Sequence, residues 1–282
     1  MGPVRASRTW FFKLENDEEM SPNTYPYLTF PPRQAKPRTV GRTLVQDKGA
    51  TLVEIAGIFE TVGAYIDYYK PSSMYHAIYP EAFTFRKIEM AKEHGIKPFM
   101  GGNVAELAYA QGTLEEHLAY TKRHGWEATE ISETYIAFPD DLKLDLIKRC
   151  ADDGLEVFYE WGLKKPTEPL VPEDAAEEIS RYVEAGVSVV IIEEGEVDLL
   201  IGKDGNGDYP ERLKKLFELV GPEKLMVETN KPRQIGWFMR EMGTTINIGN
   251  LKYDQVAEIE PLRYGIGREV DYAIYDPYLP RG

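Results

Sequence analysis

VSVVIIE, Val187 to Glu193, is a short apolar run that ends in an acid, and it is one of four such stretches in the chain. The others are Thr129-Glu130-Ile131-Ser132, Val157-Phe158-Tyr159-Glu160 and Met226-Val227-Glu228-Thr229. The four glutamates are 30, 33 and 35 residues apart, about the length of one strand, loop and helix. In a parallel barrel, all four carboxylates would therefore meet on one rim, where such barrels carry out chemistry.

The rest of the chain repeats the same unit. From Gly41 onward an apolar run and an amphipathic run alternate eight times, with strands expected at 42–46, 64–69, 96–100, 126–131, 155–160, 187–193, 224–228 and 244–248. Helix starts can be read at Asn103 and Thr113, where a capping side chain precedes a glutamate by three residues. Eight units predict a (β/α)8 TIM barrel, and their regular spacing makes a doubly wound open sheet the weaker alternative.

The predicted barrel spans residues 41–270 and leaves two flanking segments. Residues 1–40 are rich in proline and aromatic side chains, which favours an extended N-terminal arm rather than an independent domain. Residues 271–282 form a C-terminal tail with Tyr272, Tyr275 and Tyr278. Aromatic residues in both segments suggest buried contacts between subunits, so we expect a homo-oligomer.

Composition narrows the choice of partners. The net charge of −14 argues against nucleic acid and against an anionic membrane surface. No apolar run approaches the roughly 20 residues of a membrane helix. The single cysteine, Cys150, excludes a disulfide framework and favours a reducing, cytoplasmic location. An anionic substrate would need local lysines, arginines or a bound metal ion to overcome the overall negative field.

Several other candidate site residues stand where strands pass into their following loops. Gly101 and Gly102 follow the third strand and would let backbone N–H groups approach a ligand at a helix N-terminus. The remaining residues at strand ends are Asp47, Lys48, Lys70, Asn247 and Asn250. Among the four histidines only His76, in the loop after the second strand, is placed to reach this mouth.

Four neighbouring carboxylates cannot all stay ionised without a counter-charge, because like charges raise one another's pKa. A hard divalent cation held by two or three of Glu130, Glu160, Glu193 and Glu228 resolves this conflict, and Mg²⁺ is the expected ion. Lys48 and Lys70 would then serve an anionic group or an enolate. The plainer alternative is that some of these glutamates only bridge to a lysine or arginine and have a structural role.

At these strand ends the chain resembles the phosphosulfolactate synthase family, barrel enzymes that add sulfite to phosphoenolpyruvate in coenzyme M biosynthesis. The matching segments keep their order over about residues 41 to 270 and are Gly41-Arg42-Thr43, Asp47-Lys48-Gly49, Asp67 with Lys70, Gly101-Gly102, Glu130-Ile131-Ser132, Glu160, Ile191-Ile192-Glu193, Glu228, Asn247 with Asn250, and Leu262-Arg263 before Gly265.

The resemblance implies a Mg²⁺-dependent lyase that acts on a small anionic substrate. Under it, the glutamates bind the metal, and Asp47, Lys48 and Lys70 are the catalytic residues. Substrate-binding groups would come from the glycine pair Gly101 and Gly102, from Asn247 and Asn250, and from Arg263.

The chain also departs from the family pattern in three loops. Pro71 to His76 replaces a glycine-rich segment, Glu194-Gly195-Glu196 stands where the family has Gly-Arg-Glu, and Thr229-Asn230 replaces Ala-Pro. The second departure removes an arginine suited to phosphate. Lys231 and Arg233, in the loop after the seventh strand, are positioned to supply that charge.

Three functions therefore remain open. The first is the family reaction, and the second is a divergent metal-dependent lyase or isomerase that acts on another carboxylated small molecule. The third is a non-catalytic role, as in the heat-stress-associated plant proteins that look like this family. The presence of all four glutamates with both Lys48 and Lys70 argues against the third.

Overall fold

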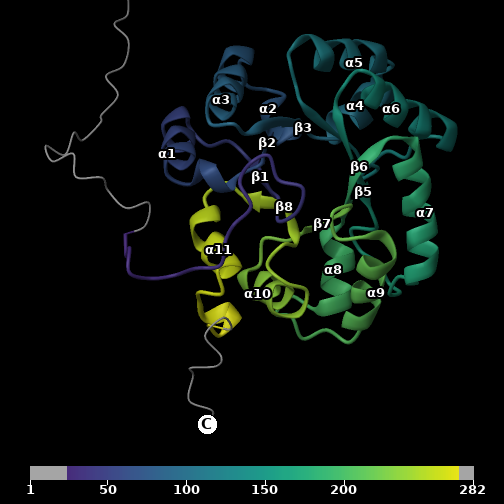
Figure 1. The fold of residues 1–282 in the computed structure, drawn as a ribbon. Helices are drawn as coiled ribbons and strands as arrows, with labels where there is room; N and C mark the ends of the chain where they lie inside the picture. Colours follow the sequence, from purple (N-terminus) through teal and green to yellow (C-terminus); the bar gives the residue numbers. More distant parts are fainter. Residues whose placement is uncertain (1–23, 273–282) are drawn as a thin grey trace, which may run out of the picture. The chain divides into compact units, whose positions relative to one another are not determined.

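The computed structural model describes residues 24–272, and within them eight parallel strands close into a barrel (Figure 1). Each strand pairs with the next along the chain, and the last pairs with the first. The strands are β1 Thr43–Asp47, β2 Tyr68–Pro71, β3 Lys97–Met100, β4 Ala128–Ile131, β5 Glu156–Trp161, β6 Val187–Ile192, β7 Leu225–Glu228 and β8 Asn247–Lys252. Closure confirms the predicted (β/α)8 TIM barrel and excludes the open sheet.

Helices form a ring around these strands (Figure 1). They are α1 Leu52–Val62, α2 Ser73–His76, α3 Glu81–Glu93, α4 Asn103–Gln111, α5 Leu114–Arg123, α6 Asp140–Asp152, α7 Pro172–Ala185, α8 Glu194–Ile201, α9 Pro210–Val220, α10 Pro232–Glu241 and α11 Val256–Arg263, with 3-10 turns η1 Gly63–Tyr65 and η2 Arg268–Val270. Three connections carry two helices each, and α2, α4 and α8 are the first helices in them. These three begin close to strand ends, so they border the mouth.

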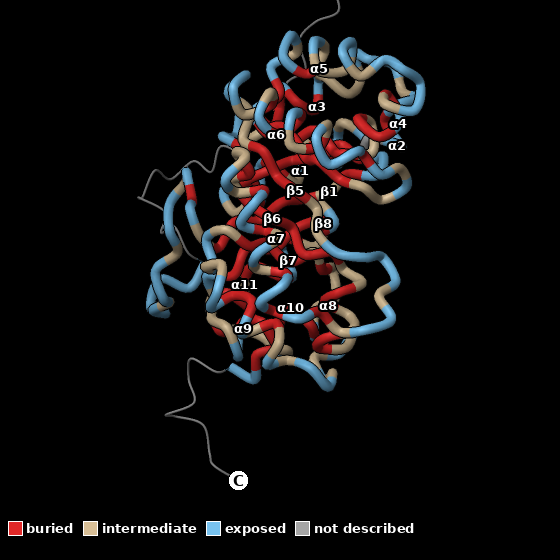
Figure 2. The backbone as a smooth tube through the Cα atoms, turned by 90° about the vertical axis from the view of Figure 1, so that its right-hand side faces the viewer, coloured by how far each residue is buried: buried red, intermediate tan, exposed pale blue. Residues whose placement is uncertain are grey.

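Alternation along the strands separates two apolar layers. One buried cluster fills the barrel interior and contains Leu44, Tyr68, Phe99, Ala128, Phe158, Val189, Ile191 and Met226. The neighbouring strand residues, such as Val157 and Tyr159, pack with the helices in a larger outer cluster. Buried residues accordingly follow the strands, and exposed ones follow the outer loops and helices (Figure 2). Because side chains alternate with period two, Lys70, Glu130 and Glu160 point inward with the first cluster.

The eighth strand is where the prediction and the structure differ most. Residues 244–248 were the expected strand, but pairing with β7 begins at Asn247 opposite Met226, and β8 runs on to Lys252. Its register with β1 shifts between Thr43 and Val45, and Asn250 has a φ of 51°. This irregularity breaks the alternation, as a β-bulge does, and directs the Asn250 side chain to the mouth.

Two predicted helix starts are confirmed, although neither uses the expected cap. α5 follows Thr113 and α4 begins at Asn103, but no capping hydrogen bond comes from Thr113, and Asn103 is already the first helical residue. In α4 the Glu106 side chain instead accepts a hydrogen bond from Asn103 Nδ2. The capping box that does form lies at Thr51 and Glu54, ahead of α1.

Contacts divide the chain into two compact units, Met1–Arg33 and Gln34–Gly282. Of the predicted arm, residues 1–23 lie outside the described part, as do residues 273–282 of the predicted tail. Among residues 24–272, no helix combines the length and apolar character that a membrane span requires. The homo-oligomer stays a prediction.

Candidate active site

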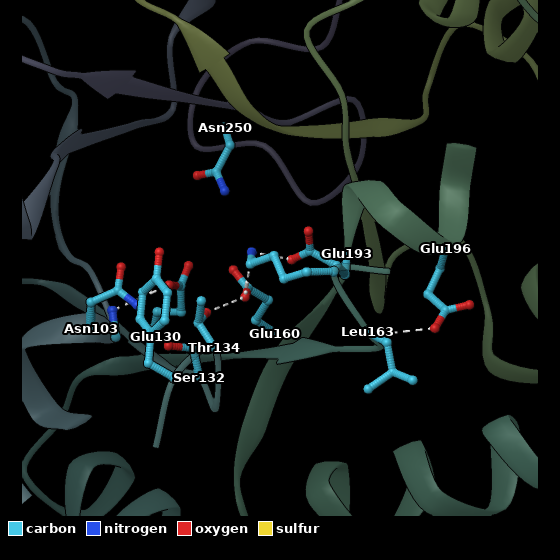
Figure 3. Close-up of polar contacts among 12 residues, drawn as sticks. Asn103, Glu130, Ser132, Thr134, Glu160, Leu163, Glu193, Glu196 and Asn250 are labelled. Atoms are coloured by element: carbon cyan, nitrogen blue, oxygen red, sulfur yellow. Dashed lines mark hydrogen bonds and ion pairs between the residues drawn. The ribbon is translucent and has the colours of Figure 1, made fainter. Parts of the chain in front are cut away.

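Three of the four predicted glutamates gather at the mouth of the barrel. Glu160 and Glu228 come from β5 and β7, and Glu193 follows β6 directly as the N-cap residue of α8. One carboxylate oxygen from each lies within 4.8 Å of the other two. Figure 3 shows Glu160 and Glu193 pointing toward the same space, with Asn250 facing them from β8. We call Glu160, Glu193 and Glu228 the acidic triad.

Glu130 lies beside the triad but has its own partners. Its Oε2 accepts a hydrogen bond of 2.7 Å from Lys70 Nζ, and its Oε1 accepts one of 3.2 Å from the backbone N–H of Gly102. Lys70 also donates to Asn250 Oδ1 at 3.1 Å. Both oxygens of Glu130 are therefore engaged, and the gathered oxygens belong to the other three glutamates.

Lys164, which the sequence analysis did not single out, supplies a second positive charge at the triad. Its Nζ lies 2.5 Å from Glu193 Oε2 and 3.2 Å from Glu160 Oε1. The Lys164 side chain is 45% exposed, whereas Lys70 is buried. The signal that could have found it is its position four residues after Glu160, in the loop that leaves β5 toward the mouth.

The loop that carries Lys164 is held against the start of α8. Leu163 donates its backbone N–H to Glu196 Oε1 at 2.9 Å, a contact that Figure 3 also draws. Gly195 makes the close approach possible, because a Cβ there would lie 2.4 Å from the Leu163 carbonyl oxygen and 2.5 Å from that of Lys164. A larger residue at 195 would push the loop away, so Gly195 allows Lys164 to reach the triad.

Burial and mutual repulsion make two members of the triad reluctant to ionise. Burial, together with Glu228 and Glu160, raises the pKa of Glu193 to about 8. Burial and the nearby Glu160 raise the pKa of Glu228 to about 7. For Glu160, burial opposes ionisation, but Lys70 and Lys164 outweigh it and lower its pKa. Two positive side chains therefore compensate only part of the negative charge.

The donor set fits a hard divalent cation. Carboxylate oxygens are the ligands that Mg²⁺ prefers, and those of the triad are close enough to share one ion. Oε2 of Glu228 is buried and has no hydrogen-bond partner among the described residues. A buried, unpartnered carboxylate oxygen is costly unless a ligand satisfies it.

Asp47 and Lys48, two predicted catalytic residues, end β1 but do not approach the triad through any described contact. Asp47 is fully buried on the helix side of the sheet, where it accepts hydrogen bonds from Lys87 Nζ and Tyr69 Oη at 2.6 Å each. His76 joins this same network, with Nε2 3.3 Å from Lys87 Nζ. Lys48 is exposed and has no ion pair within residues 24–272.

Asn247 and Arg263, predicted to bind substrate, lie at the opposite end of the barrel. Asn247 is the first residue of β8, and its Nδ2 donates to the Leu225 carbonyl oxygen at the start of β7. Arg263 Nη1 donates to the carbonyl oxygens of Thr244 and Ile246, which precede β8. Asn247 lies at this N-terminal face because β8 begins later than expected, and Arg263 reaches the same face from the end of α11.

Lys231, the N-cap residue of α10, and Arg233, in its first turn, both lie against acids. Lys231 Nζ lies 2.9 Å from Asp198 Oδ1 and also pairs with Glu194, both on α8. Arg233 Nη1 lies 3.4 Å from Asp204 Oδ1 on the surface. Neither Lys231 nor Arg233 can bind a substrate phosphate without giving up its carboxylate partner.

Gly101, another predicted substrate-binding residue, follows β3 directly and is buried at the mouth of the barrel.

A cavity of about 700 Å³ opens beside the triad. It extends between the loops after β4 and β5 and the first half of α7, and it shares Thr134, Glu160 and Lys164 with the site. Its wall contains more acidic residues than basic ones, and the basic ones are Lys164 and Lys165. Its volume is in the range of small-molecule sites.

Solved structures resemble the chain in fold alone. Type I 3-dehydroquinate dehydratase from Clostridium difficile superposes with a TM-score of 0.52 at 12% identity, covering 83% of this chain and 98% of that one. The 3-hexulose-6-phosphate synthase from Salmonella typhimurium gives 0.50 at 10% identity, covering 79% and 98%. These likenesses agree with a (β/α)8 barrel and carry no argument about function.

Proteins related by sequence share more identical residues with this chain than these solved structures do. Phosphosulfolactate synthase from Methanocaldococcus jannaschii is 32% identical over 80% of this chain and 92% of its own length, and that from Methanothermobacter thermautotrophicus is 27% identical over 86% and 96%. Protein HEAT-STRESS-ASSOCIATED 32 from Arabidopsis thaliana is 24% identical over 82% and 88%. Residues 31–269 match the sequence pattern of the (2R)-phospho-3-sulfolactate synthase (ComA) family. The resemblance seen at the strand ends is confirmed, and the chain belongs to this family.

Proposed function

We propose that this protein is a Mg²⁺-dependent lyase that adds sulfite to phosphoenolpyruvate, the reaction that the family description and the names of its relatives imply. The observation that carries the proposal is the acidic triad, Glu160, Glu193 and Glu228, flanked by Lys70 and Lys164. If these glutamates had only a structural role, each buried carboxylate would need its own counter-charge. Here two lysines, Lys70 and Lys164, face four glutamates.

Glu160, Glu193 and Glu228 would hold the ion, with Glu130 kept apart by Lys70 and Gly102. When bound, Mg²⁺ supplies positive charge that stabilises the negative charge developing on an enolate-like carboxylate. The site otherwise depends on its own side chains to bind the substrate and move the proton.

Lys70 and Lys164 have different tasks in this scheme. Sulfite sulfur forms a bond to the methylene carbon, the double-bond electron pair moves toward the carboxylate, and the adjacent carbon takes a proton while the phosphate ester stays intact. Lys70, buried and held by Glu130 and Asn250, is a fixed positive charge for the substrate carboxylate. Lys164, half-exposed, would exchange its contact with Glu193 for the substrate and deliver the proton from Nζ.

A second candidate keeps the metal and lyase chemistry but changes the substrate to another carboxylated small molecule. The specific observation is that Lys231 and Arg233, the expected phosphate ligands, are paired with Asp198 and Asp204. The adjoining cavity would also accept a larger molecule than phosphoenolpyruvate. Both candidates predict Mg²⁺ binding, and they differ in the response to phosphoenolpyruvate.

The test combines thermal melting with product formation. Mg²⁺ should raise the melting temperature, phosphoenolpyruvate should raise it further, and sulfite should be consumed with formation of phosphosulfolactate. Glu160→Gln should abolish the Mg²⁺ response, whereas Glu184→Gln, on the exposed end of α7, should retain it. Stabilisation by Mg²⁺ without any effect of phosphoenolpyruvate would favour the second candidate. The absence of a Mg²⁺ response in the unaltered protein would overturn both.

A further inference from the structure

Glu106 is a buried carboxylate that lies on α4 and not on a strand. It is 1% exposed, yet no lysine or arginine is paired with it in the described residues. A buried carboxylate without a cation must be stabilised by hydrogen-bond donors. Its donors all come from the first turn of α4 and from the loop that follows β4.

Five donors surround the Glu106 carboxylate. Oε1 accepts from Asn103 Nδ2 at 3.2 Å, from Ser132 Oγ at 2.6 Å and from the Thr134 backbone N–H at 3.0 Å. Oε2 accepts from the backbone N–H groups of Tyr135 and Ile136 at 2.8 and 2.9 Å. Three consecutive amides thus converge on one anion, which fixes the loop in a single conformation.

The loop anchored in this way carries a donor to the acidic triad. Thr134 Oγ1 donates to Glu160 Oε1 at 3.0 Å, the same oxygen that Lys164 approaches at 3.2 Å. Figure 3 shows this contact, with Thr134 between Ser132 and Glu160. Because the backbone amide of Thr134 binds Glu106 and its side chain binds Glu160, one residue joins the anchor to the site.

We propose that Glu106 is a positioning residue that orients Glu160 through Thr134 and thereby sets the affinity of the acidic triad for a divalent cation. This inference rests on the proposed function, since it assumes that the triad binds a cation. Groups that orient metal ligands typically change metal affinity about 10- to 100-fold when they are removed. Glu106 acts one step further away, so we expect an effect near the lower end.

The chemistry requires a carboxylate at position 106. A glutamine of the same size would turn an NH₂ group either toward the N–H groups of Tyr135 and Ile136 or toward the Thr134 N–H, and a donor would face backbone donors. At least one loop amide would lose its partner, which is the expensive outcome for a buried group. The Glu106→Gln change therefore releases the loop without emptying its space.

The experiment measures Mn²⁺ affinity by calorimetry and by electron paramagnetic resonance, with Mn²⁺ as the probe for the Mg²⁺ site. We expect Glu106→Gln to weaken Mn²⁺ binding about tenfold. Thr134→Val, which keeps the shape and removes the hydroxyl, should weaken it by a similar or smaller factor. Thr134→Ser should restore the affinity, and Glu184→Gln serves as the control.

Combining the two changes separates positioning from general destabilisation. If Glu106 acts through Thr134, the Glu106→Gln, Thr134→Val double variant should bind Mn²⁺ no more weakly than Glu106→Gln alone. Multiplicative losses, or a Thr134→Val variant with unchanged affinity, would overturn the inference. Should Glu106→Gln fold poorly, the comparison of Thr134→Val with Thr134→Ser still decides it.

A second readout needs no cation. Hydrogen exchange of the amides of residues 134–136 in the metal-free protein should accelerate in Glu106→Gln and stay unchanged in Thr134→Val. Failure of the proposed function would appear as an unaltered protein that does not bind Mn²⁺. Failure of this inference would appear as an unaltered protein that binds Mn²⁺ and a Glu106→Gln variant that binds it equally well.

Discussion

Lys70 and Glu130 form an ion pair inside the barrel mouth, with Nζ 2.7 Å from Oε2 and side-chain exposures of 6% and 2%. Burial by itself would lower the pKa of Lys70, but Glu130 and Glu160 outweigh it and raise the pKa above its usual value. Burial also raises the pKa of Glu130, against the effect of Lys70. Neither charge would be tolerated in this place without the other.

Removing the lysine alone should therefore destabilise the fold. Lys70→Met leaves Glu130 buried without its cation, and we expect the free energy of unfolding to fall by about 3–5 kcal/mol in urea titrations. The double change Lys70→Met, Glu130→Leu should recover most of that loss. Arg149→Met, which breaks an exposed pair with Glu115, is the control and should cost at most about 1 kcal/mol. Equal losses in Lys70→Met and Arg149→Met would contradict the account.

The acidic triad should make the cation-free protein less stable as the pH rises. Glu193 and Glu228 have folded-state pKa values of about 8 and about 7, above the usual 4.5. The folded state therefore holds more protons than the unfolded state, and stability falls between about pH 5 and 8. Urea midpoints in EDTA should decrease over this range, and Mg²⁺ should flatten the curve because it supplies the missing positive charge.

Glu193→Gln offers the matched comparison for this pH dependence. It removes the member of the acidic triad with the higher pKa and should reduce the slope in EDTA, whereas Glu184→Gln should leave the slope unchanged. An EDTA curve that is level from pH 5 to 8 in the unaltered protein would show that the triad is already neutralised by its lysines.

Much of the fold could be predicted because apolar runs typical of strands alternate regularly with amphipathic runs typical of helices. Apolar runs spaced by amphipathic helices specify eight strands in order, and all eight are present. A glutamate at the end of an apolar run must also lie near one rim of a parallel barrel, so Glu160, Glu193 and Glu228 could be grouped before their contacts were known. These conclusions depend on spacing and tolerate errors of one or two residues.

The remaining site residues could not be predicted because they depend on single-residue register and on loop geometry. A shift of one position turns a side chain to the other face of a strand, which is why Asp47 lies on the helix side. A strand over 244–248 would put Asn247 near the mouth, but the hydrogen-bonded pairing with β7 starts only at Asn247 itself. Lys164 reaches the triad only through the conformation of its loop.

Gly102 should be intolerant of even one added carbon. A Cβ there would lie 2.4 Å from Ser132 Oγ and 2.8 Å from Ser132 N, and the Gly102 N–H is itself bound to Glu130. We expect Gly102→Ala to destabilise the fold by about 1–3 kcal/mol in urea titrations. Gly57→Ala is the control, since Gly57 lies in α1 with nothing within 4 Å, and it should stabilise by about 0.5–1 kcal/mol. A neutral Gly102→Ala would mean that the loop after β4 moves freely.

Removal of the side-chain charge should have different consequences at Asp47 and at Lys164. Asp47→Asn leaves the fully buried Lys87 without its carboxylate, so we expect a loss of about 3–5 kcal/mol in unfolding free energy. Lys164→Gln removes a charge that is half-exposed but faces the buried Glu160 and Glu193, so we expect slower sulfite addition together with a smaller loss of stability than in Asp47→Asn.

The loss of stability at acidic pH gives an independent check on the charge of Asp47. Burial opposes ionisation of this carboxyl, but hydrogen bonds from His76, Lys87 and Tyr69 outweigh it and hold the pKa of Asp47 well below its usual range. A depressed folded-state pKa contributes stability above the unfolded value, and that contribution is lost as the pH falls. Urea midpoints of the unaltered protein should thus drop on acidification more steeply than those of Asp47→Asn. Parallel curves would show that Asp47 does not carry its charge in the folded protein, and the stability of this network would then have to come from packing around Lys87.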